Sequence, residues 1–376
     1  MMGIELMGEV PFSDVTIHGT ILDGQGRKMS KSLGNGIDPV AMVEEHGADA
    51  VRFSLAILTR EGQDVKLAEE KFLQGRNFLN KVWNAARFVM GDEVVAPTMD
   101  LDACDLALEE RWLRSRLASA CTDATAALQG FRTSDAAMGL YRFIWNDLCD
   151  WGLEMAKPVL REGGAAADQR RAVLAESLDA ALRMLHPFCP FLTDEVLRRM
   201  RGNDLDVSRA PWPSAAGSPD GESEADIATM QDAARAARSA RSLAGLTDGT
   251  SLAAAIRAPE EAAVRLSRSV GLLEAAAGLH DLEIGPDTSR PPHSAVGVAG
   301  EMEIYVVLGE DVDREGWRAL MDKRLAKLDG GLRSIDAKLG NQAFLANADP
   351  EVVASERERR EELVRSRDAL LRNLED

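Results

Sequence analysis

The sequence predicts a mainly helical protein with small α/β parts. Its 376 residues are rich in alanine, leucine, arginine and glutamate, while aromatic residues make up only 5%. This composition favours helices. Long stretches place apolar residues at helical spacing, and only a few short runs resemble strands. The hydrophobic content of 45% is enough for buried cores, and the length favours two or three domains.

The first 60 residues predict one strand and two helices. Residues 15–22 form a short apolar run typical of a buried strand. Asp38 and Pro39 suit the N-cap and first position of a helix that Gly47 would end. A second helix is expected from Ala48. Its inward-facing residues would be Val51, Leu55 and Leu58.

The middle of the chain predicts an all-helical region between two linkers. Residues 66–90 read as one long helix or a helix pair, and Gly91–Asp102 and Arg201–Glu224 read as linkers. Helices are expected at 108–130, 133–156, 168–186 and 193–200. The residues expected on the apolar face of 66–90 are Phe72, Leu79, Val82, Trp83, Ala86, Val89 and Met90. Core positions are also expected for Trp83, Trp145 and Trp151.

The last 150 residues predict a small α/β unit followed by a helical hairpin. Helices are expected at 225–244 and 259–275, and strands at 251–256, 280–284, 294–299 and 302–308. The first hairpin helix carries a heptad seam of Met321, Leu325, Leu328, Leu332, Ile335 and Leu339. After a turn at 340–350, the second helix has a sparser seam of Leu363, Leu370 and Leu374. The pattern predicts an antiparallel coiled coil, roughly 36 Å long at 1.5 Å per residue, that acts as an arm.

Bulk charge and cysteine usage exclude several classes of protein. The net charge of −18 argues against a chain coated in nucleic acid, although a local basic surface remains compatible with it. No apolar run approaches the length of a membrane span, and the first ten residues lack the cations of a secretory signal. The four cysteines form no C-x-x-C pair, so we expect reduced thiols in a cytoplasmic protein and no metal site. These residues are Cys104, Cys121, Cys149 and Cys189.

A cationic loop at residues 26–39, GRKMSKSLGNGIDP, stands out in this acidic chain. Lys28 and Lys31 offer point charges, Ser30 and Ser32 offer hydroxyl donors, and glycines lie on both sides. Phosphate groups need positive charge and donors on a backbone that can close over them. Such lysines stabilise the charge that develops on a leaving pyrophosphate more than they stabilise the ground state. For a lone K-x-x-K pair, a solvated surface loop is the alternative reading.

Residues 28–32, Lys-Met-Ser-Lys-Ser, resemble the nucleotide-binding signature of class I aminoacyl-tRNA synthetases. The surrounding VTIHGTILDGQGRKMSKSLGNGIDP is similar to the valine and isoleucine members of that class. So are GADAVRFSLA, GQDVKLAEEKFLQGRNFLNKVWNAARF and LHPFCPFLTDE. The later stretch KLGNQAFLANADPEVVASERERREEL resembles the C-terminal coiled-coil arm of the bacterial valine members. Loop and arm together favour a valine–tRNA ligase, an aminoacyl-tRNA ligase that attaches valine to its tRNA.

The resemblance implies roles for the residues of the loop. Lys31 is expected to bind ATP and act in catalysis, with Lys28 supporting it. Gly34 and Asn35 would fix the exit of the loop. The remaining ATP-binding residues implied are Met29, Ser30, Ser32, His18 and Gly19. For His18, an ordinary core histidine is an equally open reading.

The resemblance also implies four domains and a set of tRNA contacts. Residues 1–95 would end a Rossmann-type catalytic domain, 96–215 would form a helical anticodon-binding domain, 216–310 a linker with a small α/β unit, and 311–376 a tRNA-binding arm. The candidate tRNA-binding residues are Arg235, Arg238, Arg241, Lys323, Arg324 and Lys327. The bundle arginines Arg111, Arg114, Arg116, Arg132 and Arg142 are weaker candidates, since a solvated face explains them as well.

One departure from the family pattern concerns catalysis. Complete members carry an earlier His-x-Gly-His signature, and this sequence contains none. We therefore expect the C-terminal part of a valine enzyme, which alone does not make valyl-adenylate. The implied ligands are ATP with Mg2+, valine and tRNA-Val, with a monomer as the expected state. The alternatives are a tRNA-binding module without chemistry, a coiled-coil adaptor, and an isoleucine–tRNA or leucine–tRNA ligase fragment.

Overall fold

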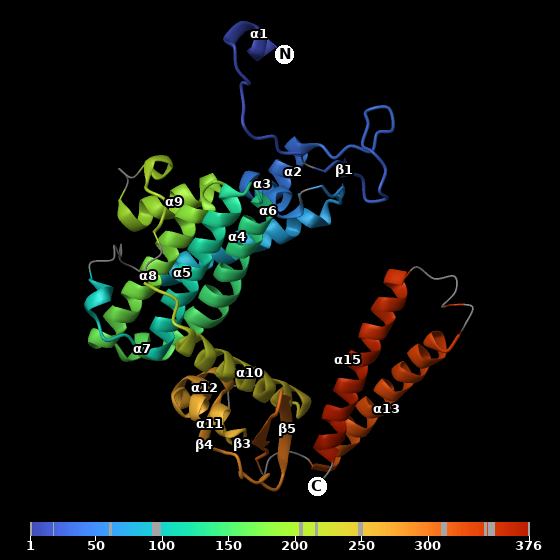
Figure 1. The fold of residues 1–376 in the computed structure, drawn as a ribbon. Coiled ribbons are helices and arrows are strands. Elements are labelled where there is room, and N and C mark those ends of the chain that lie inside the picture. Colours follow the sequence, from blue (N-terminus) through green and yellow to red (C-terminus); the bar gives the residue numbers. More distant parts are fainter. Residues whose placement is uncertain are drawn as a thin grey trace. The chain divides into compact units, whose positions relative to one another are not determined.

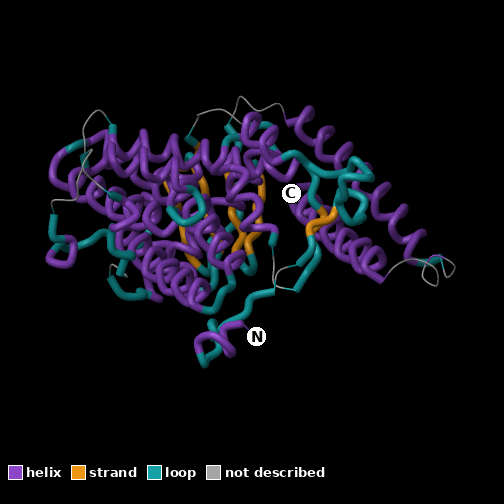
Figure 2. Tube along the Cα trace, turned by 90° about the horizontal axis from the view of Figure 1, so that it is seen from above, coloured by secondary structure: helices purple, strands orange, loops and turns teal. Residues whose placement is uncertain are grey.

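The computed structural model describes residues 2–17, 19–59, 62–91, 99–202, 206–214, 217–246, 251–309, 314–341, 344 and 350–374. The chain divides into two compact units, Met1–Glu224 and Ala225–Asp376. Helices make up most of both units, and strands are confined to two small sheets (Figures 1 and 2). The prediction of a mainly helical fold with small α/β parts is confirmed. No described helix is long and apolar enough to cross a membrane.

The N-terminal segment departs from the prediction. Helix α1 spans Met2–Met7, and strand β1 is only Ile21–Leu22, paired in parallel with β2 (Val65–Lys66). The buried strand expected from residue 15 is therefore wrong over residues 15–17, whose apolar side chains are exposed. A strand needs ladder partners for its backbone groups. Within the described residues, β2 supplies those partners only beside β1.

Three helices follow the cationic loop. Helix α2 spans Pro39–His46, with the Asp38 side chain accepting a hydrogen bond from the backbone N–H of Val40, and Gly47 ends it at φ 90°. Both helix signals are thus confirmed. Helix α3 spans Ala48–Leu58, and α4 spans Glu70–Met90. Helix α4 starts later than expected because residues 65–66 pair with β1.

A helical bundle forms the rest of the first unit. Its elements are α5 (Leu108–Gln129), α6 (Thr133–Arg142), the π-helical segment η2 (Phe143–Gly152), α7 (Leu153–Glu162), α8 (Gly164–Leu185) and α9 (Pro190–Arg201). The helix expected at 133–156 instead continues through the π-helical segment to Glu162. In the described parts of the two expected linkers, the structure has the short 3-10 turns η1 (Leu101–Ala103) and η3 (Val207–Arg209).

Helix α3 connects the loop region to the bundle. The Asp49 carboxylate accepts hydrogen bonds from the backbone N–H groups of Phe191 and Leu192, at 3.4 and 2.7 Å, and so caps α9. Arg52 donates to the carbonyl oxygens of Pro187 and Phe188, just before α9. Burial raises the pKa of the Asp49 carboxyl, and these two N–H donors oppose that shift. Side chains from α3 thus hold residues 187–192, where α9 begins.

The three tryptophans expected in the core differ in burial. Trp151 is buried, as expected. Trp83 and Trp145 are only half-buried, so the core prediction is wrong for them. A cation lies over each of these half-buried rings: Arg199 is 5.1 Å from the centroid of Trp83, and Lys81 is 3.9 Å from that of Trp145. An aromatic face at the edge of a helix attracts such cations, which the apolar pattern alone does not reveal.

The second unit contains a four-stranded sheet with helices packed against it. Helix α10 spans Gly221–Leu243 and so begins just before the unit boundary. The sheet order is β4-β3-β6-β5, with β3 and β4 parallel and the other two pairs antiparallel. Its strands are β3 (Leu252–Arg257), β4 (Leu279–Gly285), β5 (Ser294–Ala299) and β6 (Met302–Val307). All four strands were expected. The helix expected at 259–275 is split into α11 (Glu260–Ser267) and α12 (Val270–Ala277).

The C-terminal hairpin consists of α13 (Arg314–Leu339) and α15 (Pro350–Leu374). The helices are antiparallel, because Lys338 pairs with Glu356 while Asp336 pairs with Arg360. Every residue of the two expected seams is buried or half-buried, so both seams are confirmed. Most of the expected turn at 340–350 lies outside the described residues.

Candidate functional site

A buried carboxylate organises the cationic loop. The cationic loop belongs to the connection between β1 and α2, residues 23–38, and Asp23 lies at the start of this connection with only 7% of its surface exposed. Its carboxylate accepts hydrogen bonds from the backbone N–H groups of Gln25 and Arg27, at 3.0 and 2.8 Å. The Arg27 side chain adds a hydrogen bond of 2.9 Å and an ion pair of 2.8 Å. Arg27 is therefore used to hold the loop.

Asn35 joins the far end of the loop to its beginning. Its Nδ2 donates to Asp23 at 2.9 Å and to the carbonyl oxygen of Lys28 at 3.3 Å. Its Oδ1 accepts a hydrogen bond of 2.9 Å from the backbone N–H of Ser30. The bond from Asn35, followed by those from Arg27 and Gln25, lowers the pKa of the Asp23 carboxyl well below its usual range. Asp23 thus stays charged over the whole physiological range.

The two lysines of the loop differ from Arg27. Lys28 and Lys31 are both exposed, and no described residue forms a hydrogen bond or ion pair with either ammonium group. Between them, the half-buried Met29 packs against the apolar cluster formed by Met42, Val51, Leu67 and Phe72. The loop therefore has an anchored base and two cations available to an anion.

The serines and the glycine exit complete the loop. Ser30 and Ser32 share a hydrogen bond of 3.2 Å between their hydroxyl groups, and the backbone N–H of Leu33 donates to Ser30 Oγ at 3.3 Å. Gly34 adopts φ 62°, a left-handed conformation that glycine accommodates without strain. Gly19 lies so close to Gln63 that an added Cβ would collide with its carbonyl oxygen. His18 lies outside the described residues.

Three of the arginines proposed for tRNA, Arg235, Arg238 and Arg241, follow one another at intervals of three residues on α10 and are here called the arginine stripe. Arg238 donates to the carbonyl oxygen of Ala276 at 2.9 and 2.7 Å, and the buried Arg241 donates to those of Ala277 and Gly278. These carbonyls belong to the C-terminal end of α12, where cations are favourable. Arg241 is thus committed to a helix end and is a weak candidate for tRNA. Arg235 is exposed and pairs with Asp232.

The hairpin cations are more accessible. Lys323 and Lys327 are exposed on α13, and no hydrogen bond or ion pair links them to another described residue. Arg324 is half-buried and donates to the carbonyl oxygen of Leu243 at 3.1 Å. In the bundle, four of the five candidate arginines pair with carboxylates: Arg111, Arg114, Arg116 and Arg132. Arg142 is exposed.

The cysteines form no disulfide, and three of the four are buried. Burial raises the pKa of the Cys149 thiol to about 12, which keeps it protonated. The described residues contain no group of histidine, cysteine and acidic side chains able to hold a metal ion.

Three family models match successive parts of the chain. A model described as tRNA synthetases class I (I, L, M and V) matches residues 1–68, which include the cationic loop. A model of the anticodon-binding domain of tRNA ligase matches residues 110–256. A model of the valyl tRNA synthetase tRNA binding arm matches residues 311–376, the helical hairpin.

Two valine–tRNA ligases of similar sequence agree with these matches. The chain is 40% identical to a valine–tRNA ligase of Geobacter sulfurreducens over 386 aligned residues, which cover all of this chain and 43% of that protein. It is 38% identical to a valine–tRNA ligase of Nitratidesulfovibrio vulgaris, over 96% of this chain and 42% of that protein. Among solved structures, a LeuRS of Agrobacterium radiobacter K84 in a ternary complex shares 29% identity, with a TM-score of 0.41, over 53% of this chain and 23% of that one.

The chain therefore belongs to the class I aminoacyl-tRNA synthetases. The match of residues 311–376 to the valyl arm model, and the similarity of the whole chain to valine enzymes, identify the family within this class. Within the class it belongs to the valine–tRNA ligase family, and it spans less than half the length of the curated relatives it matches.

Proposed function

We propose that this chain contributes the ATP-facing lysine loop and the tRNA-binding parts of a valine–tRNA ligase. The observation that carries the proposal is a difference among the loop cations. Arg27 is paired with Asp23, whereas Lys28 and Lys31 are exposed and have no partner among the described residues. The loop is therefore held in shape without using the two charges that a polyphosphate would need.

The loop lysines would act on the leaving group. In the activation step, a carboxylate oxygen of the amino acid attacks the α-phosphorus of ATP, and pyrophosphate leaves with the bonding electrons. Negative charge grows on the pyrophosphate as that bond breaks. An ammonium group placed against it lowers the barrier, because the attraction is stronger in the transition state than in bound ATP. Mg2+ would arrive with the nucleotide and share this charge.

The positions of the two lysines suggest different contributions. Lys28 is tied to the loop base through its own backbone, since its carbonyl oxygen accepts from Asn35 and residue 28 bridges to Leu22. Lys31 lies beyond Met29 in the 3-10-like turn that ends at Gly34. We therefore infer that Lys31 moves with the closing loop and provides the larger charge stabilisation, with Lys28 supporting it.

Recognition of tRNA-Val would involve the helical bundle and the hairpin. Lys323 and Lys327 offer exposed charge on α13, which suits a phosphate backbone. Arg142 offers a similar cation on the bundle. The reduced cysteines are consistent with a cytoplasmic protein, and we propose a monomer.

The experiment that tests this function is binding of the full chain to unmodified transcripts of valine, isoleucine and leucine tRNA. Fluorescence anisotropy would be measured at low and at physiological salt. We expect tighter binding of the valine transcript, with the preference retained in salt because part of it depends on base and shape contacts. Equal affinities that all disappear with salt would overturn the proposed specificity.

A further inference from the structure

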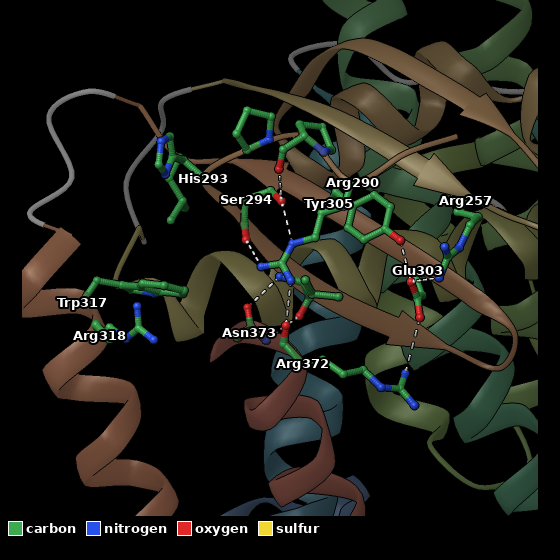
Figure 3. Close-up of a pocket in the computed structure, with 14 residues that line it drawn as sticks. Arg257, Arg290, His293, Ser294, Glu303, Tyr305, Trp317, Arg318, Arg372 and Asn373 are labelled. Carbon is green, nitrogen blue, oxygen red and sulfur yellow. Dashed lines mark hydrogen bonds and ion pairs between the residues drawn. The ribbon is translucent and has the colours of Figure 1, made fainter. Parts of the chain in front are cut away.

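The second unit contains a cavity of about 830 Å3 where the four-stranded sheet meets the base of the hairpin (Figure 3). Its volume lies within the range of roughly 300 to 1,000 Å3 typical of small-molecule sites. The lining comes from β3, β5, β6, the segment before β5, and both hairpin helices. Ten of these lining residues precede residue 311, so the cavity extends well beyond the matched arm.

The cavity concentrates positive charge in an acidic chain. Four arginines and one carboxylate line it, although the whole chain carries a net charge of −18. The carboxylate, Glu303, is occupied by protein donors: Tyr305 donates to its Oε2, and Arg257 pairs with the same atom at 2.5 Å. Arg290 is fixed by Ser294 and by the carbonyl oxygen of Arg372. Much of the polar lining is therefore rigid before any ligand arrives.

Two groups in the cavity retain unused binding capacity. The guanidinium of Arg372 is exposed and reaches Glu303 only at 3.9 Å, so most of its N–H donors are available. The indole of Trp317 is half-buried, and its Nε1 is a buried donor with no hydrogen-bond partner among the described residues. An unpaired buried donor is costly unless a bound acceptor satisfies it. Trp317 lies at one end of the cavity and Glu303 at the other (Figure 3).

We propose that this cavity binds an unpaired nucleotide of the tRNA, a role that rests on the proposed function. The base would stack on Trp317, and an adjacent phosphate would be held by Arg372. Aromatic faces and arginine are the groups that single-stranded RNA sites use. Lys323 and Lys327 follow Trp317 on the same helix, roughly 9 and 15 Å further along its axis at 1.5 Å per residue. This row of cations suits a continuing phosphodiester chain better than a free mononucleotide.

The test measures binding of the full chain to a valine tRNA transcript for the variants W317A, W317F, R372A and R365A. We expect W317A to weaken binding about tenfold, in line with the loss of one base–aromatic stack, while W317F retains affinity within about threefold. R372A should weaken binding. It should also reduce the slope of the logarithm of the binding constant against the logarithm of the salt concentration by about one in magnitude. R365A removes an equal charge from an exposed position of the same helix outside the cavity, so it should leave binding nearly unchanged.

The controls separate this inference from the proposed function. Circular dichroism and melting temperature would show that each variant is folded. If the unsubstituted chain binds the transcript and W317A and R372A bind it equally well, the cavity assignment is wrong and the tRNA function stands. An R365A loss as large as that of R372A would also overturn the assignment. AMP that binds as tightly as the transcript and loses this affinity in W317A would indicate a free-nucleotide site in the cavity instead. No transcript binding by the unsubstituted chain would overturn both proposals.

Discussion

Asn35 donates to Asp23 across the base of the cationic loop, although twelve positions separate the two residues. The same amide accepts the backbone N–H of Ser30, so one side chain holds the start, the middle and the end of the loop together. Since Asp23 is also bonded to Arg27, these two charges compensate each other, and Lys28 and Lys31 are the loop cations without a partner among the described residues. The loop is therefore both anchored and cationic.

Replacing Asn35 with alanine is expected to release the loop without unfolding the unit. The N35A variant leaves the Ser30 N–H without its acceptor and removes one donor from Asp23. Hydrogen exchange at residues 23–35 should become faster, because local opening no longer breaks these bonds. Hydrogen exchange of the backbone amides in α5 should be the same as in the unsubstituted protein. The exposed Asn84 on α4 provides a matched control, and equal loop protection in N35A and N84A would contradict the proposed clamp.

Loss of the loop lysines is expected to affect anion binding but not stability. K31A and K28A remove exposed charges without described partners, so the melting temperature should change by little. Binding of pyrophosphate with Mg2+, measured by calorimetry, should weaken about tenfold in K31A and less in K28A, as expected for loss of a charge-assisted contact. R27A should instead loosen the loop, because it breaks the pair with Asp23. Unchanged pyrophosphate affinity in the double lysine variant would rule out the assigned role.

Local signals in the sequence predicted much of this fold, and long-range pairing accounts for most of the errors. The cap at Asp38, the stop at Gly47 and the hairpin seams depend on neighbouring residues, and the structure has all of them. The strand at residues 15–17 fails because pairing requires a partner that no local pattern specifies. Likewise, the Lys-Met-Ser-Lys-Ser motif marked the loop, but the roles of Asp23 and Asn35 depend on a contact twelve residues apart.

The same limit explains the arginine stripe. The sequence predicted that Arg235, Arg238 and Arg241 contact tRNA, and of these Arg235 and Arg238 are exposed. No local pattern shows that Arg238 and Arg241 donate to the carbonyl groups at the end of α12, 38 and 36 residues further along the chain. The cavity at the hairpin base was also missed, because its residues come from five separate segments.

The two tyrosines of the chain are expected to titrate late. Burial, followed by the hydrogen bond to Glu303, raises the pKa of Tyr305 to about 12, and burial also raises that of Tyr141. A raised pKa favours the protonated phenol in the folded state. Tyr305 therefore contributes to the free energy of unfolding at pH values below the ordinary tyrosine pKa of about 10. This contribution is lost as the pH rises from there to about 12.

Absorbance at 295 nm in a Y141F background would measure Tyr305 alone. At pH 10.5 an ordinary tyrosine is about three-quarters ionised, whereas Tyr305 should be almost entirely protonated. E303Q should increase ionisation at that pH, because it removes the negative charge beside the phenol. If Tyr305 titrates near pH 10 in the folded protein, as an ordinary tyrosine does, then it is neither buried nor hydrogen-bonded to Glu303 as the structure has it.

Asn373 is expected to fasten the end of the hairpin to the sheet. Its Oδ1 accepts from the backbone N–H of Val296 at 2.7 Å, and its Nδ2 donates to the carbonyl oxygen of the same residue at 2.9 Å. The side chain is buried, so N373A leaves two buried backbone groups unpaired. We expect a loss of about 2 to 4 kcal/mol in the free energy of unfolding of the second unit, measured in urea. S366A, at an exposed position of the same helix, should have almost no effect, and a similarly small effect of N373A would refute the fastening role.

Gly75 is expected to set the spacing between α3 and α4. A Cβ added there would meet the Ser54 hydroxyl and lie 2.5 Å from the carbonyl oxygen of Ala50, both on α3. Because α3 also caps α9 through Asp49, a shift of α3 would disturb the bundle as well as the loop region. G75A should therefore destabilise the first unit by about 1 to 3 kcal/mol, the usual cost of forcing extra volume into a packed contact.

A second glycine supplies the control for this prediction. Gly139 lies inside α6, where an added Cβ has nothing within 4 Å. G139A should stabilise the same unit by about 0.5 to 1 kcal/mol, because alanine restricts the unfolded chain and favours helix. The two glycine-to-alanine changes should thus shift the urea midpoint in opposite directions. If both substitutions raise the urea midpoint, Gly75 does not set a close contact between α3 and α4.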